Sequence, residues 1–335
     1  MNYLGKKDRS MPEMNIIQAL NHTLHQQFAK DGRLVAFGED AGSFGGVFRV
    51  TAGLHDAFGD DRCFDTPLAE QGIIGFGIGM AQRGLKPICE IQFADYIFPA
   101  YDQIVNELAK MRYRTAGQYT SSLVIRTPYG GGIHGGHYHS QSPEAQFLSV
   151  PGLVVIVVTS PYDAKGLLTA AIQSNDPVIF FEPKRLYRAL KEDVPEEEYV
   201  IPIGKAAVAR IGKEVTLIGW GAQHHQNMEA AEKLAQEHHV DVEVINLRTL
   251  NPLDIPCIVN SVQKTGRCVV AHEAPLTAGF GAEIAATIME QCFLSLEAPV
   301  KRCCGLDTPF PHTLEHEYLP DANRVIQAVL ETMHY

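Results

Sequence analysis

The segment Leu153-Val-Val-Ile-Val-Val158 is an apolar run without a polar residue. A strand with one face in water alternates polar and apolar residues, so this run predicts a strand buried on both faces. Other strand-like runs occur at residues 33–37, 87–91, 123–126 and 178–181, of which the first three each include one charged residue. Segments with helical periodicity lie between them, at residues 12–29, 69–83, 98–112 and 162–173. This alternation predicts an α/β fold with a parallel sheet covered by helices on both faces.

A charged stretch with two prolines interrupts the pattern at residues 191–202. Proline and clustered charge disfavour regular structure, so we expect an interdomain linker there. The alternation then resumes with a strand at 214–219, a helix at 222–238, strands at 241–246 and 267–271, a helix at 279–290, a strand at 299–303 and a last helix from residue 321. The sequence therefore predicts two α/β domains, residues 1–190 and 204–335, with a linker at 191–203.

Composition excludes several classes of protein. The net charge of −11 disfavours a nucleic-acid-binding surface, which needs clustered Lys and Arg. No apolar run reaches the ~18 to 20 residues of a membrane helix. The first 14 residues lack the apolar core of a signal peptide and the composition of a transit peptide. We expect a protein that works where it is made, or a mature form. Its seven cysteines lack metal-ligand spacing and are expected to be free thiols.

Glu70 is the single carboxylate of an apolar, glycine-rich segment at residues 66–79. A carboxylate in dry surroundings must be paired or used for chemistry. It can also be a first-turn helix acid stabilised by the helix dipole, with Gly75 and Gly79 permitting close packing. Residue types alone leave both interpretations open.

Three histidines, His134, His137 and His139, lie within a glycine-rich segment at residues 130–143. They suggest a metal site, but no carboxylate or cysteine stands at ligand spacing. A loop that lays one or two imidazoles over a substrate is the favoured interpretation, because glycine lets backbone approach a ligand closely. A plain surface loop is the remaining alternative.

Several familiar motifs are absent from the sequence. The string Gly75-Phe-Gly-Ile-Gly79 lies inside a helix-like segment instead of at a strand-to-helix turn, so it fails the test for a dinucleotide-binding loop. There is no Gly-Lys-Ser/Thr loop, no Gly-x-Ser-x-Gly elbow and no His-Glu-x-x-His. These absences disfavour P-loop hydrolysis, serine hydrolysis and zincin chemistry.

Motifs spread over nearly the whole chain resemble one family, the β subunits of the thiamine-diphosphate-dependent E1 component of 2-oxo acid dehydrogenase complexes. They comprise Gly38–Asp40, Phe44–Arg49, Thr66–Gly72, Glu90–Pro99, Tyr138–Glu144, Phe180–Lys184, His272–Pro275 and Asp307–Pro311. The resemblance implies a pyrimidine-binding parallel-sheet domain followed by a transketolase C-terminal-like domain.

The resemblance also implies roles on the cofactor side. Glu70 is expected to bond N1′ of the aminopyrimidine of thiamine diphosphate. That bond favours the imino tautomer that removes the thiazolium C2 proton. Glu39, Leu68 and Gln92 are expected to line the pyrimidine side, and Tyr96 to face the ring.

On the substrate side, the resemblance implies contacts from Phe93, Tyr96 and His139. His139 matches a family histidine that faces substrate and takes part in proton transfer. Glu70 and His139 are thus the expected catalytic pair.

Relatives hold Mg²⁺ and the diphosphate through a Gly-Asp-Gly segment, which this sequence lacks; Gly59-Asp-Asp is the nearest string. In the family those ligands belong to an α subunit. The resemblance therefore implies an α2β2 heterotetramer with the cofactor between two chains, and inactivity of this chain alone.

The second domain of relatives packs the β–β interface and offers a docking surface to the lipoyl-bearing E2 core. Relatives also hold K⁺ in the first domain, largely through backbone carbonyls. The matching segments here lie near Leu123 and from Ala171 to Asp176, where Ser174 replaces an acid of some relatives.

The Phe180–Lys184 motif, followed by Leu186-Tyr-Arg188, is similar to the branched-chain members of the family. It implies 2-oxoisovalerate and related 2-oxo acids as substrates, in the cytoplasm of a bacterium or the mitochondrial matrix of a eukaryote. The nearest alternative is the same subunit serving pyruvate or acetoin. A non-catalytic assembly protein of the same fold is another. A self-sufficient transketolase-like enzyme conflicts with the length and the missing metal loop.

Overall fold

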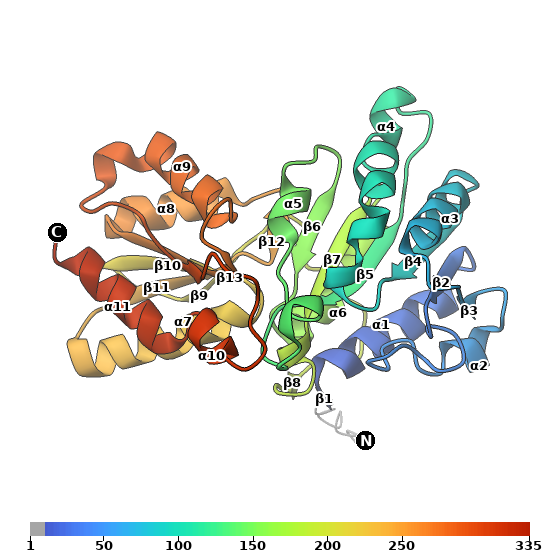
Figure 1. Ribbon diagram of the computed structural model, residues 1–335, viewed down its shortest axis with the longest axis horizontal. Helices are drawn as coiled ribbons and strands as arrows, with labels where there is room; N and C mark the ends of the chain where they lie inside the picture. Colours follow the sequence, from blue (N-terminus) through green and yellow to red (C-terminus); the bar gives the residue numbers. More distant parts are fainter. Residues whose placement is uncertain (1–10) are drawn as a thin grey trace, which may run out of the picture.

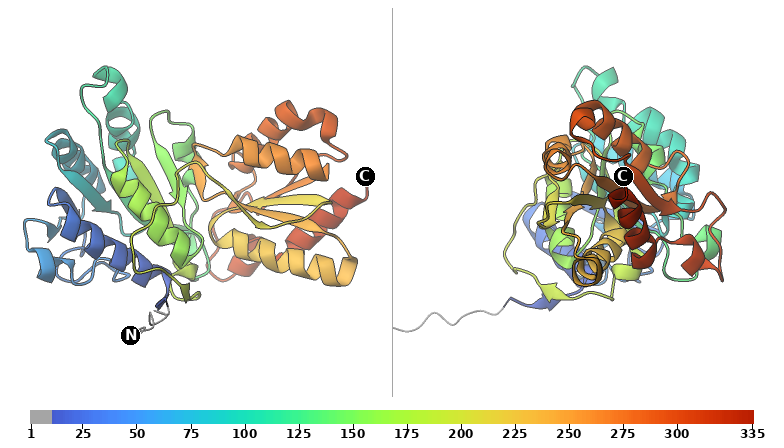
Figure 2. Two further views of the ribbon diagram at one scale, coloured as in Figure 1. Left: turned by 180° about the vertical axis from the view of Figure 1, so that it is seen from behind. Right: turned by 90° about the vertical axis from the view of Figure 1, so that its left-hand side faces the viewer.

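The computed structural model describes residues 11–335, which form two α/β units side by side (Figures 1 and 2). Residues 1–10, on which most of the signal-peptide argument rested, lie outside the described residues. From residue 11 to the C-terminus, no helix combines the length and apolar character needed to cross a membrane.

The first unit is built on a seven-stranded sheet in the order β12-β6-β7-β5-β4-β2-β3. Its strands are β2 (Leu34–Gly38), β3 (Cys63–Asp65), β4 (Lys86–Glu90), β5 (Val124–Tyr129), β6 (Val154–Val157), β7 (Val178–Pro183) and β12 (Thr249–Asn251). All neighbours pair in parallel except β12, which runs antiparallel to β6. The apolar run at residues 153–158 is buried almost throughout. The predicted parallel sheet is confirmed.

Helices cover both faces of this sheet. On one face α1 (Ile16–Lys30) packs with α6 (Pro161–Gln173), and on the other lie α3 (Glu70–Gln82) and a π-helical segment (Gln103–Leu108). Short helices are α2 (Leu54–Phe58), α4 (Met111–Arg114) and α5 (Glu144–Leu148). α1 begins at a capping box, because the Asn15 side chain accepts from the Gln18 N–H and the Gln18 side chain accepts from the Asn15 N–H.

The helix expected at residues 98–112 is divided into several pieces. A 3₁₀ turn at Phe98–Ala100 precedes the π-helical segment, and α4 follows it. Pro99 lies in that 3₁₀ turn, where its missing N–H costs no helical hydrogen bond. The periodicity was therefore right about helical character and wrong about a single regular α-helix.

The second unit has a five-stranded sheet in the order β14-β13-β10-β11-β9. Its strands are β9 (Ala207–Arg210), β10 (Val215–Gly219), β11 (Val242–Asn246), β13 (Cys268–Pro275) and β14 (Lys301–Gly305). One face carries α7 (Gly221–Lys233) and α11 (Ala322–Met333); the other carries α8 (Ile255–Thr265) and α9 (Gly281–Cys292). A short helix, α10 (Glu315–Tyr318), lies at the junction with the first unit.

The stretch between the units is held along the first one. Its strand β8 (Glu192–Asp193) pairs antiparallel with β1 (Glu13–Met14). The buried Lys165 ammonium donates to the carbonyls of Pro195 at 2.5 Å and Glu196 at 2.9 Å. The connection is thus packed against the first unit, which the charged, proline-containing sequence did not indicate.

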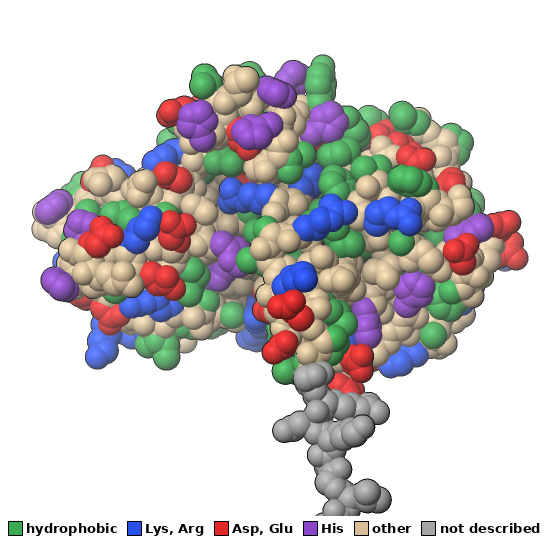
Figure 3. Space-filling view, turned by 90° about the horizontal axis from the view of Figure 1, so that it is seen from below, with side chains coloured by type: hydrophobic (Ala, Val, Ile, Leu, Met, Phe, Trp, Pro, Cys, Tyr) green, Lys and Arg blue, Asp and Glu red, His purple; other side chains and the backbone are tan. Residues whose placement is uncertain are grey.

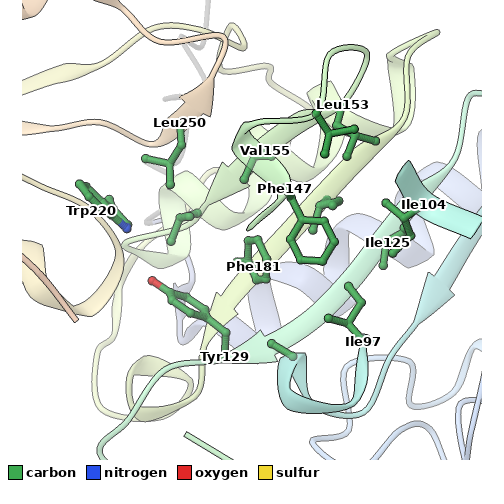
Figure 4. Packing of buried hydrophobic residues seen from close by; sticks show 14 of the residues in the cluster. Ile97, Ile104, Ile125, Tyr129, Phe147, Leu153, Val155, Phe181, Trp220 and Leu250 are labelled. Atoms are coloured by element: carbon green, nitrogen blue, oxygen red, sulfur yellow. The ribbon is translucent and has the colours of Figure 1, made fainter. Parts of the chain in front are cut away.

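The two units share a core as well as a sheet. Trp220 follows β10 of the second unit and belongs to the same buried cluster as Tyr129, Phe147 and Phe181 of the first (Figure 4). Because β12 also joins the first sheet from within the second unit, the units meet through backbone hydrogen bonds and apolar packing.

Candidate active site

Glu70 is the first residue of α3, at the positive end of the helix dipole. Its side chain is buried, with the residue 8% exposed, and among residues 11–335 no group donates a hydrogen bond to its carboxylate. Ala69, the residue before the helix, offers no side-chain cap. The carboxylate oxygens keep some contact with solvent, so a ligand can reach them, and this position suits an acid whose hydrogen-bond donor comes from a ligand.

Glu39 and Gln92 reach the same region because β2 and β4 are parallel neighbours, with Gly38 paired to Glu90. Residues just beyond the carboxyl ends of such strands gather at one edge of the sheet, where open α/β sheets bind ligands. Burial raises the pKa of Glu39, and the charge of Glu70 raises it further. Gln92 Nε2 donates to Asp40 Oδ2 at 3.0 Å.

The surface beside Glu70 is apolar and open. Leu68 is 79% exposed and Phe76, on α3, is 53% exposed. A hollow of about 350 Å³ lies next to them, lined in part by Thr66 and Ala69. Leu68 therefore lies near the acid, as expected, but its side chain contacts little of this chain.

Tyr96 and His139 form the other part of the site. The Tyr96 hydroxyl lies 2.8 Å from His139 Nε2, and His139 Nδ1 lies 3.3 Å from the Gly135 carbonyl oxygen. Phe93 stands edge-on to the imidazole, with ring centroids 4.6 Å apart. Burial raises the pKa of Tyr96, and the charges of Asp95, Glu39 and Glu70 add to the shift. The phenol thus contacts the histidine and lies near Asp95, Glu39 and Glu70.

Asp95 fixes the backbone beside that histidine. Its Oδ1 accepts hydrogen bonds from the N–H groups of Ser140 at 3.2 Å and Gln141 at 3.0 Å. Asp95 lies inside the Glu90–Pro99 motif, but the sequence did not single it out among the expected site residues. The available signal was an acid, Asp95, two residues after Phe93 in a motif otherwise expected to line the pocket.

Lys184 was also missed. It follows β7, and its Nζ is buried 5.6 Å from the centre of the Phe93 ring, with no acceptor among residues 11–335. Burial lowers the pKa of Lys184 to about 8, against the opposing charges of Asp95, Glu273 and Glu315. The Phe180–Lys184 motif therefore ends at the candidate site.

The three loop histidines point to different partners. His134 Nδ1 lies 3.4 Å from the His312 carbonyl oxygen, His137 packs on Tyr138 and His139 faces Tyr96. Over residues 11–335 no three His, Cys, Asp or Glu side chains are grouped to hold a metal ion. Figure 3 shows histidines gathered at one edge of the lower face. All seven cysteines are free thiols, as their spacing predicted.

The segments expected to hold K⁺ already use their carbonyl groups. Leu123 O accepts from the Val178 N–H, and Ala171 O from the Ser174 N–H. Ser174 O accepts from a serine hydroxyl at 2.6 Å. The Asp176 carboxylate pairs with Arg112 at 2.7 Å. Each of these carbonyl oxygens keeps a second lone pair, so the hydrogen bonds leave the expected K⁺ site a prediction.

Comparison with known proteins identifies both units. Residues 12–189 match the transketolase pyrimidine-binding domain, and residues 204–325 match the transketolase C-terminal domain. A solved split-gene transketolase, described as an inactive beta4 tetramer, shares the fold with a TM-score of 0.79 at 22% identity, over 96% of this chain and 98% of that one.

Two curated relatives extend along nearly the full chain. The mitochondrial 2-oxoisovalerate dehydrogenase subunit beta of Dictyostelium discoideum is 54% identical over 96% of this chain and 87% of the relative. The pyruvate dehydrogenase E1 component subunit beta of Staphylococcus epidermidis is 45% identical over 97% of this chain and all of the relative. With both domains matched and identities of this size, the chain belongs to the family of 2-oxo acid dehydrogenase E1 β subunits.

Proposed function

We propose that this chain is the β subunit of a branched-chain 2-oxo acid dehydrogenase E1. Together with an α subunit it would decarboxylate acids such as 2-oxoisovalerate and pass the acyl group to a lipoyl group of E2. The observation that carries the proposal is the Glu70 carboxylate at the start of α3, on a residue that is 8% exposed, without a donor from residues 11–335 and close to Glu39 and Tyr96.

Thiamine diphosphate fits this arrangement because a protonated ring nitrogen is the donor that Glu70 lacks. When bound, the cofactor supplies the electron sink that decarboxylation requires. Glu70 would hold the proton shared with that ring nitrogen, and Tyr96 and Phe93 would orient the substrate and exclude water. His139 would exchange a proton at Nε2, the nitrogen that contacts the Tyr96 hydroxyl.

The sequence lacks the Gly-Asp-Gly segment that holds Mg²⁺ and the diphosphate in relatives, as expected if the chain forms only half of the active site (a half-site). Asp60, in the string nearest to Gly-Asp-Gly, is an exposed acid paired with His55, and the string lacks the second glycine of the metal-binding segment. The exposed apolar side chains of Leu68 and Phe76 beside Glu70 suit cover by a partner subunit. We therefore propose that an α subunit supplies the Mg²⁺ and diphosphate ligands. A K⁺ ion near Leu123 and between Ala171 and Asp176 stays a prediction.

The second unit is proposed to contribute to the β–β interface and to dock the E2 core. This assignment rests on the matched C-terminal domain and on the family alone.

The substrate preference rests on the likeness of the Phe180–Lys184 motif to branched-chain members and on the relative named for 2-oxoisovalerate, which is 54% identical. Pyruvate is the second candidate, since a relative named for pyruvate is 45% identical. One or two methylenes in an apolar pocket change specificity by about 1 to 3 kcal/mol, so competing substrates will separate the two assignments.

The test is decarboxylation of 2-oxoisovalerate and pyruvate by this chain, with and without its α subunit, in the presence of thiamine diphosphate and Mg²⁺. We expect activity only in the mixture, and faster turnover of 2-oxoisovalerate. Activity of the chain alone would contradict the half-site, and a preference for pyruvate would move the subunit to a sister complex.

A further inference from the structure

The loop at residues 130–141 is irregular, and it carries His139. Its two ends are joined, because the Gly130 N–H donates to the Gln141 carbonyl at 3.0 Å. Asp95 of the first unit fixes only the residues after the histidine. The part before the histidine needs other support, because a glycine-rich segment has little conformational preference of its own.

Two carboxylates of the second unit supply that support. The Gly131 N–H donates to Glu273 Oε2 at 3.1 Å, and the His134 N–H donates to Glu315 Oε2 at 3.1 Å. Glu273 lies on β13 and Glu315 begins α10, and both side chains are buried. In Figure 1, the red helix α10 lies next to this green loop. Hydrogen bonds from backbone N–H groups to buried carboxylates are charge-assisted and strong.

Cations of the first unit are placed among these acids. Arg185 Nη2 lies 3.0 Å from Glu273 Oε1. The buried Lys184 ammonium feels the charges of Asp95, Glu273 and Glu315, the three acids that hold the loop. Of these two consecutive basic residues after β7, Arg185 pairs directly with Glu273, and Lys184 lies near the acids of both units without a direct hydrogen bond to them.

The fit between the loop and its supports is close. A Cβ atom on Gly131 would lie 2.6 Å from Phe310 Cζ, and one on Gly132 would lie 2.5 Å from Arg185 Cδ. The loop backbone thus rests directly on side chains of the second unit and on the arginine that pairs with Glu273. Its position depends on residues more than 130 positions away in the sequence.

We propose that Glu273 and Glu315 are positioning residues for His139, so that the second unit sets the geometry of a site whose other residues lie in the first. The catalytic part of this inference rests on the proposed function, whereas the structural part does not. Removing either acid frees the loop, moves the imidazole from Tyr96 and slows the step that needs His139.

The structural test is hydrogen–deuterium exchange of the full chain. We expect Glu315→Ala and Glu273→Ala to speed exchange of the amides of residues 131–141 by at least about tenfold, with β10 peptides unchanged as an internal reference for folding. Glu315→Gln keeps an oxygen acceptor and should restore most of the protection. Glu317→Ala, at an exposed residue two positions away, is the matched control. Unchanged exchange in both alanine variants would overturn the proposal.

The kinetic test uses the reconstituted α–β complex. Glu315→Ala should lower kcat about 10- to 100-fold, as expected when a reacting group is displaced by about 1 Å, with cofactor affinity retained. In a His139→Ala background the same change should cost less than about twofold, because Glu315 acts through the histidine. An equal loss in both backgrounds, or a freed loop with normal kcat, would refute the inference. A wild-type complex inactive on every 2-oxo acid would refute the proposed function, and the exchange result would still decide the structural part.

Discussion

The two sides of the candidate site are built in different ways. Glu70 stands at the start of a regular helix, next to strand ends whose order is set by the parallel sheet. His139 stands in an irregular loop whose shape depends on Asp95, Glu273 and Glu315. The acid is therefore placed by secondary structure, whereas the histidine is placed by long-range contacts to single side chains.

The two sides of the site should therefore respond differently to mutation of residues that do not contact the ligand. On the helix side, only a change to the functional residue itself should matter greatly, because its neighbours hold the backbone through many hydrogen bonds. On the loop side, residues that never touch the ligand should matter nearly as much as the histidine, because each supplies one of few supports.

The largest effect is expected from Glu70→Ala. It removes the only group proposed to hold the cofactor ring proton, so kcat of the α–β complex should fall by about 10³-fold or more. Assembly should survive, because the Glu70 side chain makes no hydrogen bond with residues 11–335 and the backbone of α3 is unchanged. Steady-state decarboxylation and sedimentation velocity measure both outcomes. Asp61→Ala, at an exposed acid of the same unit, is the control. Near-normal turnover in Glu70→Ala would show that this acid has another role.

His139→Ala should have the next largest effect, a loss of about 10²- to 10³-fold in decarboxylation or lipoyl acylation. Affinity for thiamine diphosphate should be mostly retained, because the imidazole faces Tyr96 and Phe93 instead of Glu70. Single-turnover kinetics and cofactor titration separate these quantities. A large fall in cofactor affinity with normal chemistry would instead make His139 a cofactor-binding residue.

Gly131→Ala tests the long-range supports without removing a functional group. The new methyl group would meet Phe310 at 2.6 Å and Leu319 at 3.0 Å, so the loop must shift. We expect a loss of about 10- to 100-fold in kcat. Gly32→Ala, where nothing lies within 4 Å, is the matched control and should leave kcat unchanged. Equal kcat values in Gly131→Ala and Gly32→Ala would show that the position of His139 does not depend on the close packing of the loop.

The smallest effect is expected at the junction of the units. Glu144 accepts from Trp220 Nε1 at 3.0 Å, and burial raises its pKa to about 7 from an ordinary value of 4.5. The folded chain therefore holds this proton more tightly than the unfolded chain. Its stabilising contribution is complete below pH 4.5 and is lost as pH rises to 7.

Glu144→Gln should accordingly reduce the fall in unfolding free energy across that pH range, by on the order of 3 kcal/mol. Urea denaturation midpoints at several pH values would show the change, with Asp61→Asn as the control. The same pH dependence in wild type and variant would mean that Glu144 is ionised in the folded chain.

The sequence predicted the regular elements well because they follow local patterns. The run at 153–158 indicated a buried strand, and the segment from Glu70 indicated a helix that begins at an acid; both are present. The three-residue strand β12 was missed, because Thr-Leu-Asn has no strand pattern and pairs with β6 about a hundred residues earlier. Glu273 and Glu315 were missed for the same reason, since only the folded chain brings them to the loop.

Strand β12 also bears on whether the chain can be divided. A cut near residue 203 would separate the two matched domains at a point that looks natural in sequence. It would also strip β6 of its antiparallel neighbour and leave a bare row of N–H and C=O groups on an apolar strand, the type of edge that recruits other chains and aggregates. The pyrimidine-binding domain is therefore a poor candidate for expression as an independent module, and fusions or truncations should keep residues through Asn251 in place.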